Sequence, residues 1–285
     1  MIEIEQISLR LGDLVFDARA AGPATGDRVF LCHGFPQTSH CWHRLMPALA
    51  RAGYRAIAPD GRGLSPGARP ERLADYHVDH LVADVIGFAD ASGADRFHLV
   101  GHDWGGLQGW QVAGRHPDRV ASFTSLSTPH NRAFREALED PATGQADRSG
   151  YFEIFRTPGS GEDMWLAGGE EGLRGLYQAA GLTREEAEPY VEVFRDRAAL
   201  TGLLSWYRAG EPTWDEGLGR IQTPTLYCWG SEDAALGPAA AEKTADWIDG
   251  PYRFEVFEGM GHWLPEHGGA RLEALLLDHL ARHPV

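Results

Sequence analysis

The sequence predicts an α/β protein in which helices cover both faces of a mostly parallel β-sheet. Short apolar runs alternate with helical segments over the first 128 residues, a rhythm typical of strands joined by crossover helices. The same rhythm returns after residue 217, whereas the intervening stretch is helical, aromatic-rich and charged. We therefore expect one α/β core, formed by residues 1–128 and 217–285, with a helical cap inserted at residues 129–216.

Eight strands are expected in this core. The opening segment, Ile2 to about Ala18, alternates polar and apolar residues and turns at Gly12-Asp13, which predicts an antiparallel hairpin. The remaining strands are short apolar runs at Arg28–Cys32, Tyr54–Ala58, Phe97–Val100, Val120–Ser127, Thr225–Trp229 and Tyr252–Phe257. Helices are expected at Trp42–Ala52, His77–Ala91, Pro238–Ile248 and Arg271–Arg282, and after the glycine-rich turn that follows Val100.

The charge balance restricts the partners. With 26 Lys and Arg against 41 Asp and Glu, the formal net charge is −15, and such a field repels nucleic acids and anionic membranes. No window approaches the ~18 consecutive apolar residues that suggest a membrane span, and the N-terminus lacks the pattern of a signal peptide. We expect a small-molecule substrate and neither a nucleic-acid nor a membrane partner. A homodimer is compatible with the sequence.

Cysteine and histidine usage indicates neither a disulfide framework nor a metal centre. The three cysteines, Cys32, Cys41 and Cys228, are an odd and small set, which favours a reducing cytoplasm. His40 and His43 have no cysteine or carboxylate beside them at ligand spacing, so no metal is expected. The glycines do not form a phosphate-cradling GxGxxG motif, so no cofactor is implied.

A nucleophile turn is indicated where the Phe97–Val100 strand ends. Gly101-His102-Asp103-Trp104-Gly105 has small residues on both sides of a central carboxylate, between a predicted strand and a predicted helix. This pattern makes a tight, strained turn that exposes the central side chain above the sheet. The alternative is an ordinary turn in which Asp103 caps the following helix.

Two further residues follow later strands in the order that a catalytic triad requires. Gly230-Ser231-Glu232-Asp233 follows the Thr225–Trp229 strand, where the acid should stand, and Gly261-His262-Trp263 follows the last strand. Residues of the right type in the right order, each at the carboxyl end of a strand, predict a triad of Asp103, Asp233 and His262. Glu232 competes for the acid role, and we favour Asp233.

At these positions the sequence resembles the epoxide hydrolases of the α/β-hydrolase fold, with the dehalogenases as close relatives. The matching motifs are His33-Gly34-Phe35-Pro36, Asp60-Gly61-Arg62-Gly63, the Asp103 turn with Gly106, and the late Asp233 and His262. They cover nearly the whole core. One departure from these motifs is Leu64, where an aromatic residue is expected. This departure makes the substrate inferred from the resemblance less specific.

An aspartate nucleophile selects the reaction. A carboxylate is already ionised near neutral pH, with a reference pKa of about 3.9. Its attack on an ester would give an unstable mixed anhydride, whereas attack on a saturated carbon gives an ordinary ester that water can cleave. His262, oriented by Asp233, would activate that water, and the backbone N–H groups of Phe35 and Trp104 would form the oxyanion hole. No routine esterase or peptidase activity is expected.

The leaving group separates the two related reactions. Epoxide opening produces an alkoxide that needs a proton donor, whereas a halide leaves without a proton and prefers N–H donors. Tyr151 and Tyr207 lie in cap segments that resemble those carrying the ring-opening tyrosines of epoxide hydrolases. Tyr177 and Tyr190 lie in less similar surroundings. The sequence therefore favours vicinal diol formation, with Tyr151 and Tyr207 as acids.

Three alternatives stay open on the sequence. Trp104 and Trp206 could supply indole N–H groups to a halide in a dehalogenase. A biosynthetic enzyme could open an epoxide with the substrate's own hydroxyl, and a hydrolase-like binding protein could have a silent site. Pro36, Trp206 and Trp263 are expected to contact the substrate.

Overall fold

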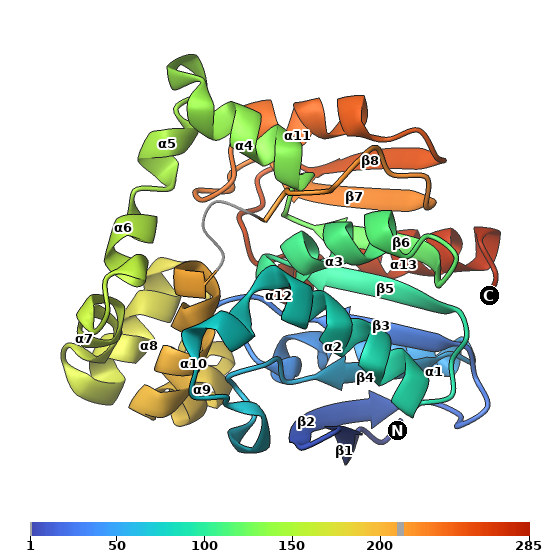
Figure 1. Ribbon diagram of the computed structural model, residues 1–285, viewed down its shortest axis with the longest axis horizontal. Coiled ribbons are helices and arrows are strands. Elements are labelled where there is room, and N and C mark those ends of the chain that lie inside the picture. The colour runs from blue at the N-terminus through green and yellow to red at the C-terminus, as the bar shows by residue number, and fades with distance from the viewer. Residues whose placement is uncertain (1, 210–213) are drawn as a thin grey trace.

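An eight-stranded β-sheet forms the centre of the computed structural model, which describes residues 2–209 and 214–285 (Figure 1). The strands lie in the order β1-β2-β4-β3-β5-β6-β7-β8. Strand β2 pairs antiparallel with β1 and β4, and all other neighbours pair in parallel. The bounds are β1 Glu5–Leu11, β2 Leu14–Ala21, β3 Arg28–Cys32, β4 Arg55–Pro59, β5 Phe97–His102, β6 Val120–Leu126, β7 Thr225–Gly230 and β8 Tyr252–Phe257.

This sheet confirms the predicted fold class. Strands β5, β6 and β7 are buried along their whole length, because parallel strands are covered by helices on both faces. Helices α2 (Val78–Ala91) and α3 (Trp104–Arg115) lie in front of the sheet in Figure 1, and α13 (Gly269–Arg282) lies behind it, where it contacts α1 (Leu45–Arg51).

Two predicted helices are shorter in the structure. The segment expected at Trp42–Ala52 is divided into a 3-10 turn, Ser39–Trp42, and α1, because the Thr38 side chain caps the turn by accepting from His40 N. The segment expected at Pro238–Ile248 is α11 (Pro238–Lys243) followed by a 3-10 turn, Thr244–Trp247.

The described residues between β6 and β7 form a series of helices. The series contains α4 (Asn131–Glu139), α5 (Gln145–Arg148), α6 (Tyr151–Arg156), α7 (Ser160–Leu166), α8 (Gly169–Ala179), α9 (Arg184–Phe194) and α10 (Arg197–Ala209). Helix α4 packs against α11 of the core, whereas α6, α7 and α9 pack against α10 beside the carboxyl ends of the strands (Figure 1). Residues 210–213 of the predicted cap lie outside the described residues.

The turn after β4 joins the core to the cap. Gly63 has φ +93, and a Cβ added there would lie 2.6 Å from the backbone of Gly202 in α10, so only glycine permits this approach. Arg62 forms a buried ion pair with Asp84, at 2.6 Å. Leu64, where an aromatic residue was expected, is buried. The Asp60–Gly63 motif therefore positions α10, the helix that carries Tyr207.

None of the helices in residues 2–209 and 214–285 is both long enough and apolar enough to span a bilayer.

Candidate active site

Asp103 occupies a strained turn between β5 and α3. Its backbone has φ 52 and ψ −118, a region that costs a non-glycine residue about 1–3 kcal/mol. The flanking glycines are required because a Cβ at Gly105 would lie 2.0 Å from Cys32 O, and a Cβ at Gly101 would lie 2.1 Å from Gly105 O. The pattern predicted from the sequence therefore forms a turn that holds the Asp103 carboxylate at the carboxyl end of β5.

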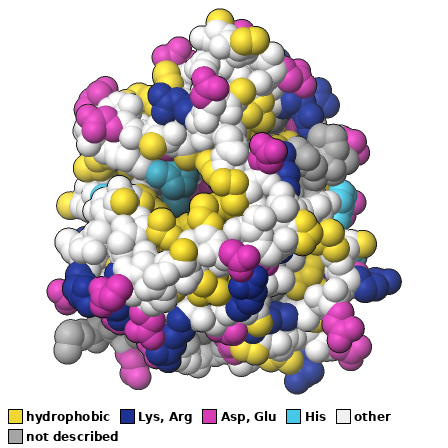
Figure 2. Space-filling view, turned by 90° about the vertical axis from the view of Figure 1, so that its left-hand side faces the viewer, with side chains coloured by type: hydrophobic (Ala, Val, Ile, Leu, Met, Phe, Trp, Pro, Cys, Tyr) yellow, Lys and Arg dark blue, Asp and Glu magenta, His cyan; other side chains and the backbone are white. Residues whose placement is uncertain are grey.

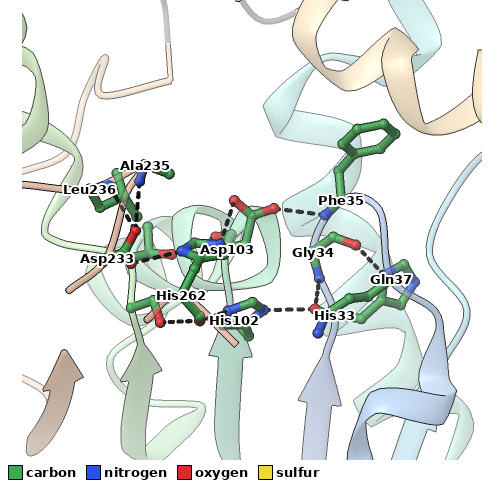
Figure 3. A network of polar contacts seen from close by, with 12 residues as sticks. His33, Gly34, Phe35, Gln37, His102, Asp103, Asp233, Ala235, Leu236 and His262 are labelled. Atoms are coloured by element: carbon green, nitrogen blue, oxygen red, sulfur yellow. Dashed lines mark hydrogen bonds and ion pairs between the residues drawn. The ribbon is translucent and has the colours of Figure 1, made fainter. Parts of the chain in front are cut away.

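The Asp103 carboxylate has two partners (Figure 3). Its Oδ1 accepts a hydrogen bond from Phe35 N at 2.7 Å, and its Oδ2 lies 3.6 Å from His262 Nε2. Burial acts to raise the pKa of Asp103, but its interactions with His262, together with His102 and the Phe35 N–H, hold that pKa below its usual value. The side chain is thus an ionised carboxylate at neutral pH.

His262 also contacts the acid favoured from the sequence. Its Nδ1 lies 2.8 Å from Asp233 Oδ2, and the other Asp233 oxygen accepts from the N–H groups of Ala235 and Leu236 (Figure 3). Asp233 is buried, whereas Glu232 is exposed. Burial opposes protonation of His262, but Asp233 and Asp103 raise its pKa to about 10. The imidazole is therefore positively charged at neutral pH.

A buried polar network behind His262 was not anticipated from the sequence. His102 Nε2 lies 2.8 Å from His262 O, and its Nδ1 lies 2.7 Å from Gln37 Oε1 (Figure 3). Gln37 Nε2 in turn donates to Glu266, which also accepts from Tyr190. Burial lowers the pKa of His102 to about 3, so this imidazole is neutral. The only sequence signal was position, since His102 lies within the Asp103 motif and Gln37 follows the His33-Gly34-Phe35-Pro36 motif.

The two cap tyrosines lie across from Asp103. Tyr151 is the first residue of α6 and Tyr207 lies in α10, and their ring centroids are 6.5 Å apart. Both side chains line the same two cavities as Asp103. Burial, followed by the negative charge of Asp103, raises the pKa of each phenol well above 10. Both tyrosines therefore keep their protons at neutral pH.

Two cavities meet at these three side chains. The front cavity has a volume of about 670 Å³ and is lined by residues that include Pro36, Trp263 and His262. The rear cavity has a volume of about 30 Å³ and lies on the side of Leu107 and Phe134. Figure 2 shows a hollow, bordered by hydrophobic side chains, on the face of the molecule that carries the cap.

Residues 27–268 match the family model described as alpha/beta hydrolase fold. Epoxide hydrolase A of Mycobacterium tuberculosis is 34% identical to this chain, over 91% of this chain and 92% of its own length. The chain belongs to the epoxide hydrolase family of the α/β-hydrolase fold.

Other relatives support this placement in the epoxide hydrolase family. Epoxide hydrolase 4 of Mus musculus is 30% identical, over 91% of this chain and 74% of its own length. A crystal structure of Epoxide Hydrolase A from Mycobacterium thermoresistibile matches with a TM-score of 0.87 at 28% identity, covering 99% of this chain and all of that one. The resemblance stated from the motifs is confirmed, and the protein is a hydrolase.

One residue expected at the substrate lies elsewhere. Trp206 lines neither of the two cavities beside Asp103. Its Nε1 donates to Arg62 O at 2.8 Å, and its ring faces the Asp60–Gly63 turn. The expectation treated Trp206 and Tyr207 alike, but adjacent residues on a helix point in different directions. Trp206 therefore joins the cap to the core.

Within residues 2–209 and 214–285, no group of three or more His, Cys, Asp or Glu side chains is arranged to hold a metal ion. His33, in the His33-Gly34-Phe35-Pro36 motif, accepts from Gly61 N through Nε2 at 2.9 Å and so joins this motif to the Asp60–Gly63 turn.

Proposed function

We propose that this protein adds water to an epoxide to give a vicinal diol, through a covalent ester on Asp103. One arrangement carries the proposal. Tyr151 and Tyr207, two protonated phenols, line the same cavities as the ionised carboxylate of Asp103. An acid and a nucleophile acting on one small ring match the needs of epoxide opening, in which a carbon–oxygen bond breaks as a proton is supplied.

In the first step, Asp103 Oδ2 attacks a ring carbon. The carbon–oxygen bond of the ring breaks, its electron pair stays on oxygen, and a phenol of Tyr151 or Tyr207 donates the proton. The products are an alkyl ester of Asp103, a neutral hydroxyl and a tyrosinate. The second phenol can stabilise the developing alkoxide by donating a hydrogen bond.

In the second step, His262 removes a proton from water, which attacks the carbonyl carbon of the ester. The bond between this carbon and the alkyl oxygen then breaks, the leaving diol oxygen takes the proton from His262, and the Asp103 carboxylate is regenerated with one oxygen from water. Ester formation removes the negative charge of Asp103, one of the causes that raise the pKa of His262. The imidazolium therefore becomes more acidic after the first step and can transfer its proton, directly or through solvent, to the tyrosinate. The neutral imidazole then acts as the base, and Asp233 Oδ2 holds its Nδ1 at 2.8 Å.

The second step also develops negative charge on the ester oxygen. Phe35 N already donates to Asp103 Oδ1 at 2.7 Å, and this oxygen becomes the carbonyl oxygen when Oδ2 forms the ester. The Trp104 N–H follows directly in the chain and is the second proposed donor. In other enzymes the loss of one such donor costs about 3 kcal/mol.

The dehalogenase alternative has less support. Trp206 Nε1 donates to Arg62 O and is thus engaged with protein, whereas halide binding would require N–H groups directed at the leaving atom.

The test is intact-mass analysis of a His262→Gln variant incubated with styrene oxide. We expect a mass increase equal to one molecule of epoxide, located on Asp103, because ester formation does not need the histidine whereas ester cleavage does. Asp103→Asn in the same background should show no increase. An unmodified His262→Gln protein, with a substrate that the parent converts to diol, would contradict the mechanism.

Two further assays separate the alternatives that share this site. Diol release from styrene oxide and bromide release from a bromoalkane distinguish epoxide opening from dehalogenation. With ¹⁸O-labelled water, hydrolysis leaves label in the diol after repeated turnover, whereas opening by a hydroxyl of the substrate leaves none. A silent binding protein would give no product in either assay.

A further inference from the structure

The two cavities at Asp103 differ greatly in size. The front cavity measures about 670 Å³. The rear cavity measures about 30 Å³, which is room for about two water molecules. Asp103, Tyr151 and Tyr207 line both cavities and therefore stand between them. An epoxide ring that touches the carboxylate and the phenols together would lie at this junction.

The rear cavity has an apolar wall. Seven apolar side chains line it: Trp104, Leu107, Pro129, Phe134, Phe152, Trp214 and Leu236. Three of these rings pack against one another, with centroid distances of 6.3 Å for Phe134–Phe152, 5.7 Å for Phe152–Trp214 and 5.8 Å for Phe134–Trp214. Because protein interiors are close-packed, such a cluster resists the displacement that a larger guest would require.

We propose that the substrate carries one bulky apolar substituent on one ring carbon and nothing larger than a methyl group on the other, and that Phe152 sets this limit. The inference rests on the proposed function. When the phenols hold the ring oxygen and Asp103 attacks a ring carbon, trans substituents on the two carbons point in opposite directions, one toward each cavity. The front cavity has room for an aryl group, and the rear cavity has room for hydrogen or methyl.

Phe152 is singled out by its position. It follows Tyr151 in α6, it is only partly buried, and its ring centroid lies 5.4 Å from that of Tyr207. Phe152 therefore borders the space directly behind the reacting ring. Phe155, three residues further along the same helix, lines the front cavity instead. The two phenylalanines form a matched pair for a test of the two cavities.

The first measurement uses the parent protein and three epoxides: styrene oxide, trans-β-methylstyrene oxide and trans-stilbene oxide. We expect diol from the first two and a kcat/KM for trans-stilbene oxide lower than that for trans-β-methylstyrene oxide by at least about 100-fold. One methylene group in a hydrophobic pocket is already worth about 10–200-fold. Similar kcat/KM values for the two trans epoxides would overturn the inference and leave the proposed function standing. No diol from any of the three would contradict the proposed function, and the inference with it.

The second measurement identifies the residue. The preference is the ratio of kcat/KM for trans-β-methylstyrene oxide to kcat/KM for trans-stilbene oxide. Phe152→Ala should reduce this ratio by at least about tenfold, because the substitution removes a side chain that is larger than several methylene groups. Phe155→Ala removes the same side chain from the front cavity and should leave this preference within about threefold of that of the parent. A folded Phe152→Ala protein with unchanged preference would contradict the role of Phe152.

A variant that partly fills the rear cavity tests the same inference without removing Phe152. Leu236→Phe places a larger side chain in the rear wall and should lower kcat/KM for trans-β-methylstyrene oxide, relative to styrene oxide, by about tenfold. Far-UV circular dichroism reports whether each variant is folded. If Leu236→Phe is folded and the ratio does not change, the rear cavity does not receive the methyl group, and the inference is wrong.

Discussion

Arg208 and Glu162 form a buried ion pair, with Nη2 of the arginine 2.7 Å from Oε2 of the glutamate and side chains only 8% and 3% exposed. Arg208 follows Tyr207 in α10, and its Nε donates to the carbonyl oxygen of Phe155 in α6 at 3.0 Å. Arg208 thus joins the helix that carries Tyr207 to α7 through Glu162 and to the helix that carries Tyr151 through Phe155, and we expect it to maintain the separation of the two phenols.

Replacing Arg208 by methionine should therefore affect both stability and activity. We expect Arg208→Met to lower the free energy of unfolding by about 3–5 kcal/mol, because Glu162 is left charged and buried without its partner. It should also lower kcat/KM for styrene oxide by about 100-fold, the effect of displacing a reacting group by about 1 Å. Urea denaturation and steady-state assays measure the two quantities.

The control is the double variant Glu162→Met/Arg208→Met. It removes both charges and should regain most of the stability lost in Arg208→Met, since apolar side chains of similar volume often replace a buried ion pair without loss. If Arg208→Met alone unfolds at the same urea concentration as the parent, the ion pair does not hold the cap helices together.

The two tyrosines should act on ester formation. We expect Tyr151→Phe and Tyr207→Phe each to slow the first step by about 10–100-fold, and the double variant to slow it by about 10³-fold or more, the range of general acid catalysis. Stopped-flow measurement of ester formation under single-turnover conditions reports this step directly. Tyr252→Phe, which removes a buried hydroxyl of β8 that has no hydrogen-bond partner within residues 2–209 and 214–285, serves as control and should leave the rate within about twofold.

The pH dependence of ring opening should reflect the burial of the phenols. Burial and then the charge of Asp103 raise the pKa of Tyr151 and Tyr207 above the reference value of 10.0, so both keep their protons to higher pH than an exposed tyrosine. The lowered pKa of Asp103 keeps the nucleophile ionised throughout this range. We expect the single-turnover rate at pH 11 to stay within about twofold of that at pH 8, whereas an ordinary phenol would lose about tenfold over this range. A decline centred near pH 10 would show that an ordinary phenol supplies the proton.

Asp233→Asn should block the second step. Asp233 Oδ1 accepts from two backbone N–H groups and its Oδ2 faces His262 Nδ1. In the asparagine the amide nitrogen would face Nδ1, so His262 would carry its proton on Nε2 and could not accept one from water. A comparable change in a serine protease triad lowers kcat by about 10⁴-fold. We expect the ester to accumulate, as seen by intact mass.

Glu232→Gln is the matched control for this variant. Glu232 adjoins Asp233 in the chain, but its side chain is exposed. No ester should accumulate in this variant at steady state. Accumulation in Glu232→Gln and none in Asp233→Asn would exchange the roles of the two acids.

Features that depend on local chemistry could be predicted from the amino-acid sequence. The Asp103 turn could be predicted because the glycines that it needs lie within two residues of Asp103. The buried strands could be predicted from apolar runs because parallel strands are covered on both faces. Residue type at the ends of strands also indicated that Asp103, Asp233 and His262 would converge, since the carboxyl ends of parallel strands meet at one edge of the sheet.

Features that depend on the direction of side chains and on distant partners could be seen only in the folded structure. Glu232 and Asp233 differ by a single position, and the hydrogen bonds of Ala235 and Leu236 show which carboxylate turns toward His262. Trp206 turned away from the site because α10 packs against the Asp60–Gly63 turn.

The polar network of His102, Gln37 and Glu266 and the unequal cavities were likewise invisible in the sequence. Each is built from segments far apart in the chain, such as Gln37 and Glu266, which are separated by 229 positions. Periodicity and turn residues report on neighbours a few positions away. The shape of a cavity depends instead on how the cap packs against the core, and that packing is set by contacts that no local pattern records.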